Sequence, residues 1–227
     1  MDDWEPSSPY WFIGIYIGGT NRGCSQPNLT ASWVRHNANY GWGFTLIWSG
    51  AQAPCATRSF NTYFSRNPTT AYSQGVRAAD GAKNAAYYLG FSSIATVNRI
   101  YYDLEPFDTS SSSCVAAAKS YINGWDHELL VNSRYYGGLY GSTCASDLRA
   151  FASISNLPYD ILPAYWNNSY SVYGLRCLPD SYWGNHQRIH QFRGEYNVTW
   201  GSHTLHIDGD CADADVARND GISIGCE

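Results

Sequence analysis

The stretch "RIYYDLEPFD", residues 99–108, joins a run of apolar and aromatic residues to two carboxylates that stand one residue apart. The apolar part has the character of a buried strand, and Asp103 and Glu105 follow at its carboxyl end. Because successive side chains of a strand point to opposite faces, we expect the two acids on one face and Leu104 on the other. Two rises along the strand separate their Cα atoms by about 6.6 Å.

Two acids this close at the rim of an apolar core cannot both ionise freely. Like-charge repulsion and partial loss of water raise the pKa of at least one of them. A protonated acid beside a carboxylate is the pair that cleaves a glycosidic bond. The alternative is structural, with one carboxylate capping the next segment or pairing with an arginine such as Arg99.

Apolar runs alternate with helical patterns along the whole chain. We expect strands at 11–19, 43–50, 99–105, 135–142, 160–167, 187–192 and 204–210, and helices at 28–37, 70–90, 113–130 and 144–154. Strands with intervening helices indicate a parallel sheet with crossovers. Seven strands leave two architectures open, an open doubly wound sheet and an eight-stranded barrel that lacks one strand.

Polar and aromatic residues at the expected strand ends favour the barrel. Besides the two acids, these residues are Tyr16, Trp48, Tyr140, Trp166, Gln191 and Asp208. The strand ends of a barrel ring a single mouth, where the active site is built, whereas an open sheet spreads them along an edge. The predicted fold class is therefore α/β, a (β/α)8 TIM-type barrel formed by one domain over residues 1–227.

Composition and charge exclude several classes of function. The net charge is −5 and the chain has only two lysines, which argues against a nucleic-acid partner. The sequence has no apolar run long enough to span a bilayer. The glycines of "IGGTNRG" lack the order of a dinucleotide-binding turn, and the histidines lack the spacing of a metal site. We therefore predict no cofactor and no metal.

Seven cysteines without paired zinc-site spacing favour disulfides in an oxidising compartment, and hence a secreted protein. The odd number leaves one cysteine over. We hypothesise a bridge between Cys24 and Cys55, because both follow strand-like runs. The opening "MDDWEPSSPY" is acidic and polar, unlike a signal peptide, which indicates a mature or trimmed form.

Several motifs together point to a family. "YYDLEPF", "GGLYGS", "PAYWN" and "HQF", followed by "HIDGDCAD", resemble the bacterial Rv2525c-like family of glycoside-hydrolase-like domains, which is similar to the family-25 lysozymes. The resemblance covers residues 9–215. It implies a (β/α) barrel, secretion and a cell-wall glycan of the peptidoglycan type as the partner. We also expect the protein to be a monomer.

The resemblance also implies roles for the site residues. Glu105 would be the general acid, Asp103 would assist the water or stabilise charge at the anomeric carbon, and Asp208 would be the last-strand acid. From the strand-end pattern and the second acidic cluster, we expect the substrate-binding residues to be Tyr16, Trp48, Tyr140, Trp166, Gln191 and Asp210. The family's first strand, with its own Asp, has no counterpart here, so we expect a barrel truncated at its N-terminus. This gap favours a second hypothesis, a non-catalytic glycan-binding module on the same fold.

Overall fold

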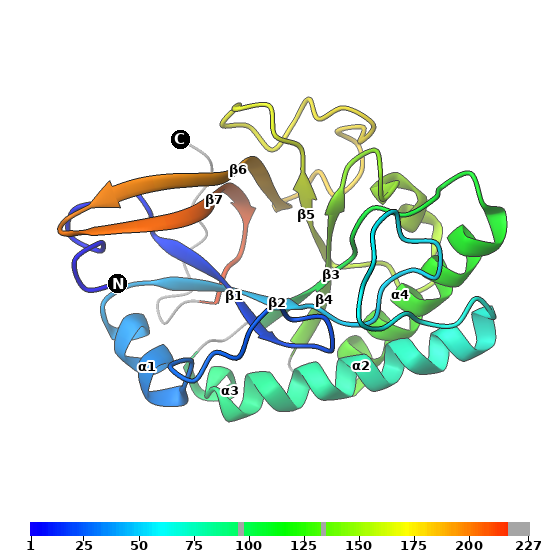
Figure 1. Ribbon diagram of the computed structural model, residues 1–227, viewed down its shortest axis with the longest axis horizontal. Helices are drawn as coiled ribbons and strands as arrows, with labels where there is room; N and C mark the ends of the chain where they lie inside the picture. The colour runs from blue at the N-terminus through cyan, green and yellow to red at the C-terminus, as the bar shows by residue number, and fades with distance from the viewer. Residues whose placement is uncertain (95–97, 133–134, 218–227) are drawn as a thin grey trace.

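The computed structural model describes residues 1–94, 98–132 and 135–217 of the chain. These residues form one seven-stranded sheet, in which the strands follow each other in chain order. The strands are β1 (Phe12–Gly18), β2 (Gly43–Trp48), β3 (Asn98–Asp103), β4 (Tyr135–Ser142), β5 (Asp160–Ala164), β6 (Gln187–Trp200) and β7 (His203–Ala214). Figure 1 shows β6 and β7 extending as a long ribbon beyond the rest of the sheet.

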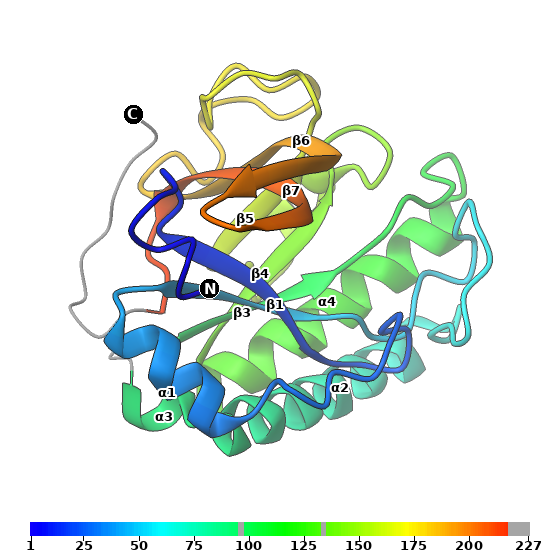
Figure 2. The same ribbon diagram turned by 60° about the vertical axis from the view of Figure 1, so that its left-hand side comes forward.

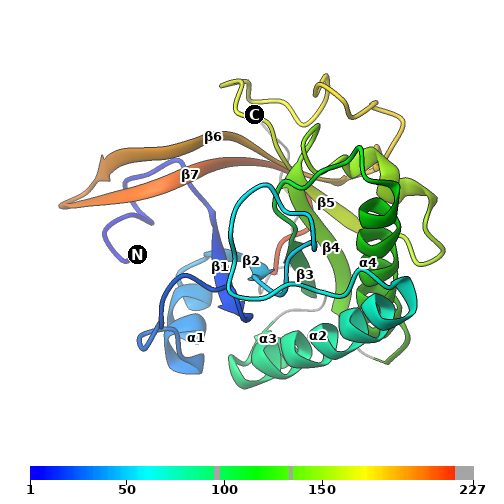
Figure 3. The same cartoon turned by 45° about the vertical axis from the view of Figure 1, so that its right-hand side comes forward.

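The helices lie outside the curl of this sheet, as Figure 3 shows. They are α1 (Ala31–Asn39), α2 (Pro68–Tyr88), α3 (Phe91–Ile94) and α4 (Ser112–Asn132), with a 3-10 helix η1 (Leu148–Ser153). Local chemistry sets their ends: Thr30 accepts a hydrogen bond from the Trp33 N–H at 3.2 Å, and Gly90 stops α2 with a φ of 88°. The helices expected at 28–37, 70–90 and 113–130 are confirmed, whereas 144–154 holds only η1.

The predicted (β/α)8 barrel is wrong. Strands β1 to β6 run parallel to their neighbours, but β7 runs antiparallel to β6. The chain turns back directly at Gly201, whose φ is 57°, and so cannot make the crossover that a parallel strand needs. Residues 165–186, between β5 and β6, are irregular rather than helical. The result is a curled, mostly parallel half-barrel with β1 and β7 as the edges of the described sheet.

Two hydrophobic clusters hold the curl. The larger cluster packs the convex face against the helices, with Tyr102 of β3 beside Tyr121 and Trp125 of α4. The smaller one lies on the concave face, and we call it the inner cluster: Tyr101, Leu162, Ile189, Ala212, Ala214 and Val216. Gly138 pairs with Tyr101, and a Cβ at this position would overlap the Tyr101 ring, so glycine makes this packing possible.

The N-terminal segment, residues 1–11, reaches from β1 to the β6–β7 ribbon (Figure 2). The Trp4 indole N–H donates to the His203 carbonyl at 3.1 Å, and the Tyr10 and Tyr196 hydroxyls lie 3.0 Å apart. Trp4 and Tyr10 stack with their ring centroids 5.7 Å apart. The segment thus braces both edges of the sheet.

Disulfides join Cys55 to Cys114 and Cys144 to Cys177, while Cys24 is exposed and free. The hypothesised bridge between Cys24 and Cys55 is therefore wrong. It failed because the long loop after β2 contacts both neighbouring segments, but at different points. Asn61 and Thr62 of this loop bind Asn21 of the segment after β1, whereas Cys55 lies against the start of α4. Within the part of the chain that the structure describes, no helix is both long and apolar enough to cross a membrane.

This connectivity can be tested by peptide mapping of the unreduced protein. We expect Cys55 to be recovered with Cys114 and Cys144 with Cys177. We also expect iodoacetamide to label Cys24 almost completely without denaturant, because this thiol is exposed and unbridged. A peptide that links Cys24 to Cys55 would contradict the assignment.

Candidate active site

Asp103 ends β3 on the concave face of the sheet. Tyr101, two residues earlier, belongs to the inner cluster, so strand alternation directs Asp103 to the same side. Only 4% of Asp103 is exposed, and its register partner is Tyr140 of β4. Glu105 lies just beyond the strand, yet it lines the same hollow as Asp103.

This first hollow has a volume of about 490 Å³. Besides the two acids, its walls include Tyr16, Ser49 and Arg58. Burial is the main cause that raises the pKa of Asp103 to about 7, and the nearby Glu105 charge raises it further, while Ser49 and Arg58 act in the opposite direction. The Asp103 Oδ1 atom is buried without a hydrogen-bond partner. Asp103 can therefore hold a proton at neutral pH.

Glu105 forms an ion pair with Arg58, whose Nη2 lies 2.7 Å from Glu105 Oε1. The loop that carries Arg58 is fixed next to the site: Thr57 donates its N–H to the Pro106 carbonyl at 2.9 Å, and Cys55 is bonded to α4. Arg99, the alternative partner considered for the acids, pairs instead with Asp160 and Asp215. The two acids thus have different environments within one hollow.

Gln52 holds the backbone of both acids. Its Nε2 donates to the Asp103 carbonyl at 2.6 Å, and its Oε1 accepts the Glu105 N–H at 2.9 Å. Gln52 is completely buried, so these hydrogen bonds satisfy polar groups that cannot reach water. The amide therefore fixes the path of the chain across the carboxylate pair.

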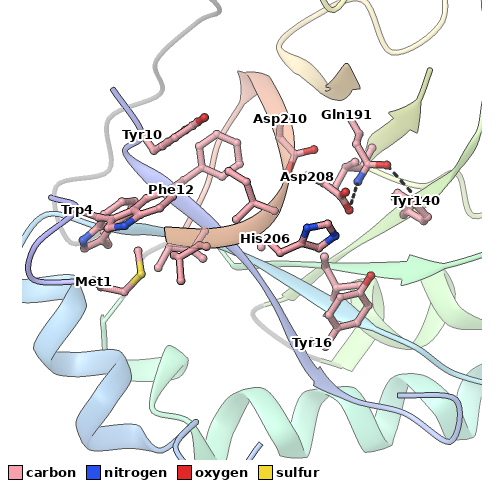
Figure 4. A pocket seen from close by; sticks show the side chains of 17 residues that line it. Met1, Trp4, Tyr10, Phe12, Tyr16, Tyr140, Gln191, His206, Asp208 and Asp210 are labelled. Carbon is pink, nitrogen blue, oxygen red and sulfur yellow. Dashed lines mark hydrogen bonds between the residues drawn. The ribbon is translucent and has the colours of Figure 1, made fainter. Parts of the chain in front are cut away.

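A second hollow, of about 300 Å³, holds the other carboxylate pair, Asp208 and Asp210 (Figure 4). Gln191 organises it: its Nε2 donates to Asp208 Oδ2 at 3.2 Å, and its Oε1 accepts from the Tyr140 hydroxyl at 3.3 Å and from the Trp166 indole at 3.0 Å. Burial, helped by the Asp208 charge, raises the pKa of Asp210 to about 7. This pair also combines a protonatable acid with a hydrogen-bonded carboxylate.

Tyr16 connects the two hollows, because its side chain lines both of them. Its pKa is raised above the usual value, first by burial and then by the charges of four acids. These acids, in decreasing order of effect, are Asp103, Asp208, Glu105 and Asp210. Both carboxylate pairs therefore face one tyrosine ring, and together they form one candidate site.

Of the residues predicted from the sequence, the structure brings nearly all to this site. Asp103, Glu105, Asp208, Asp210, Tyr16, Tyr140 and Gln191 line the two hollows, and Trp166 is hydrogen-bonded to Gln191. Trp48 lies elsewhere. Its ring packs over Gly18 and Gly81 on the helix side of the sheet, and it lines neither hollow.

Sequence reasoning missed Ser49, Gln52 and Arg58. Ser49 follows Trp48 directly, so alternation along β2 alone could have placed it on the concave face opposite Trp48. Gln52 and Arg58 lie in the loop after β2, where no periodic pattern relates them to Asp103 and Glu105. Only the loop's contacts with residues 104–108 reveal their position.

No group of three or more His, Cys, Asp or Glu side chains among the described residues is placed to hold a metal ion. The side chains available for chemistry at the site include carboxylates, hydroxyls and amides. Two carboxylate pairs in a cleft, each with one acid that titrates near neutrality, are suited to general acid–base catalysis.

Paired carboxylates, such as those on the concave face of this sheet, are the groups that glycosidic bond hydrolysis uses. The family model described as "Rv2525c-like, glycoside hydrolase-like domain" matches residues 2–212, and the chain belongs to this family. Among solved structures, it is similar to the 1.07 Å crystal structure of an uncharacterised B. stearothermophilus protein, with 17% identity and a TM-score of 0.53. That match covers 91% of this chain and 86% of the other, and it shows a shared fold alone. No curated protein matches the chain.

The raised pKa of Asp103 makes the stability of the protein depend on pH. Between pH 3.8 and about 7 the folded protein keeps a proton that the unfolded chain has released, so the free energy of unfolding falls as the pH rises through this window. Asp103→Asn preserves the shape and removes the ionisation. Relative to wild type, we expect the variant to gain roughly 1–4 kcal/mol between pH 4 and pH 8, at about 1.4 kcal/mol per pKa unit.

Urea unfolding at pH 4, 6 and 8 measures this gain. Other buried carboxyls, such as Asp126 and Asp210, occur in both proteins and cancel in the difference. A difference between variant and wild type that stays constant with pH would show that Asp103 ionises as freely in the folded protein as in the unfolded chain.

Proposed function

We propose that this protein hydrolyses a glycan by carboxylate acid–base catalysis at the first hollow. The observation that carries the proposal is the unequal pair: Asp103 is buried, with its pKa raised to about 7, while Glu105 in the same hollow is paired with Arg58. Glycosidic bond cleavage needs a proton donor and a carboxylate at the same bond. Membership of a glycoside hydrolase-like family supports this class of function.

These environments favour the reverse of the roles expected from the resemblance. Asp103, which retains a proton near neutrality, would protonate the glycosidic oxygen of the leaving group. Glu105 would take the proton of the attacking water, with Arg58 holding its carboxylate in place. Gln52 would keep both groups in register through the backbone.

The second carboxylate pair and its neighbours would bind the sugar. Asp208 and Asp210 offer acceptors to sugar hydroxyls, and the exposed ring of Trp166 offers a stacking surface that Gln191 holds in orientation. A glycan chain would therefore run from the first hollow past Tyr16 toward the Trp166 ring.

Peptidoglycan is our proposed substrate, and we propose that the protein is secreted to reach it. Two disulfides are compatible with an extracellular protein. The family resemblance and the paired carboxylates support a β-linked wall polysaccharide. The neighbouring aromatic rings suit the apolar faces of its sugar units.

A non-catalytic glycan-binding module is the second candidate function, and one contact favours it. The Arg58–Glu105 ion pair occupies one oxygen of a carboxylate that hydrolysis would use. In a binding module the same acids would accept hydrogen bonds from sugar hydroxyls without turnover.

Turnover of purified peptidoglycan separates the two candidates. If hydrolysis occurs, Asp103→Asn and Glu105→Gln should each reduce it by about 10²–10⁴-fold, the range typical of general acid–base groups. Activity should also decline as the pH rises above about 7, because Asp103 then loses the proton it must donate. Release of reducing ends, followed from pH 5 to 9, measures both effects.

Asp108→Asn is the matched control, because this acid lies in the same segment but is exposed and bonded to Ser110. It should leave turnover unchanged. Sedimentation with insoluble peptidoglycan reports binding separately. Binding by all four proteins without turnover in any would refute the hydrolase and support the binding module.

A further inference from the structure

We infer that the second hollow binds a glycoside whose sugar carries an apolar group, with the sugar at the carboxylates and the apolar group beside the N-terminal segment. This inference rests on the proposed glycan function of the site and specifies the class of substrate. The observation behind the inference is that one end of this cavity is polar and the other end is apolar.

The polar end consists of Tyr16, Tyr140, Gln191, Asp208 and Asp210. The apolar end consists of Trp4, Phe12, Trp42, Leu205 and Ile207. Both sets line the same cavity of about 300 Å³. Figure 4 shows Trp4 and Phe12 on one side, Asp208, Asp210 and Gln191 on the other, and Tyr16 and His206 nearer the acids. A ligand that fills this cavity must therefore be polar in one part and apolar in the other.

The apolar end is already formed in the protein. Trp4 and Trp42 are 3% and 2% exposed, and both belong to the larger hydrophobic cluster. The Trp4 indole is fixed by the His203 carbonyl, and the Tyr10 hydroxyl beside it by Tyr196. A preformed wall needs little ordering when a ligand binds, so the apolar area buried there adds to affinity.

A second sugar ring would fit this end poorly. The polar atoms of Trp4 and Tyr10 are already engaged with the β6–β7 ribbon, and Phe12, Leu205 and Ile207 have no polar side-chain atoms. The buried Trp42 indole N–H lacks a partner in the described structure, but one donor replaces only one of the several hydrogen bonds that the hydroxyls of a sugar ring make to water. An alkyl, acyl or aryl group of a few carbons would instead gain from leaving water.

The cavity volume limits the occupant. About 300 Å³ lies at the small end of the range for ligand pockets, which favours one sugar ring with a short apolar substituent over a long lipid. Leu205 is the best position for a test, because it lines the apolar end and is 36% exposed, so a polar replacement leaves the core intact. Leu130 on α4, 57% exposed and outside the cavity, provides the matched control.

The experiment measures the binding of alkyl β-glucosides from methyl to octyl, below their micelle concentrations, by calorimetry. The Asp103→Asn background prevents turnover of the probes. We expect affinity to rise about three- to fourfold per methylene until the apolar end is full. With Leu205→Gln added, the rise in affinity per methylene should be at least twofold smaller, whereas with Leu130→Gln added it should stay unchanged. Equal thermal midpoints would confirm that all variants fold.

Equal affinity for methyl and hexyl glucosides would overturn the inference, as would no measurable binding of any member of the series. A chain-length dependence that persists in the Leu205→Gln protein would place the alkyl group elsewhere and also overturn it. The proposed hydrolysis is tested by a different measurement, the turnover of peptidoglycan. Absent turnover with an intact chain-length dependence would refute the hydrolysis alone, and turnover without a chain-length dependence would refute this inference alone.

Discussion

The candidate site depends on a layer of apolar side chains packed inside the curl of the sheet. Tyr101, Ile189 and Ala212 belong to this layer. One alternation further along each strand lies a polar residue: Asp103 after Tyr101, Gln191 after Ile189, and Asp210 beside Ala212 on the antiparallel β7. The strand register that satisfies the hydrophobic packing therefore also sets the carboxylates at one level, without a closed barrel.

The same packing explains why the acids have unusual proton affinities. An apolar layer directly beneath Asp103 and Asp210 removes water from them, and a second acid stands next to each one. Burial of such acids lowers the stability of the folded protein, so their presence calls for another explanation. Two such acids lie at equivalent positions on opposite arms of the sheet, and in the proposed function Asp103 donates a proton while Asp210 binds the sugar.

Much of the fold and most of the site could be predicted from the sequence, for a specific physical reason. Strand periodicity locates Asp103 and Tyr140 near the ends of β3 and β4 and directs Gln191 and Asp210 to the concave face, and that information is local. The barrel failed on a local pattern as well: residues 195–200 alternate polar and apolar side chains and lead into Gly201, which is typical of a hairpin. The position of Arg58 could not be predicted, because it follows from a loop packing against a segment 47 residues away.

The cross-link between Cys55 and Cys114 has a practical consequence for anyone who produces this protein. It closes a span of 59 residues and anchors the loop from which Arg58 approaches Glu105. A recombinant host with a thiol-rich cytoplasm would keep these cysteines reduced. The polypeptide recovered there would lose the covalent tether of this loop, so the cross-link in a preparation has to be established before its cleft is tested.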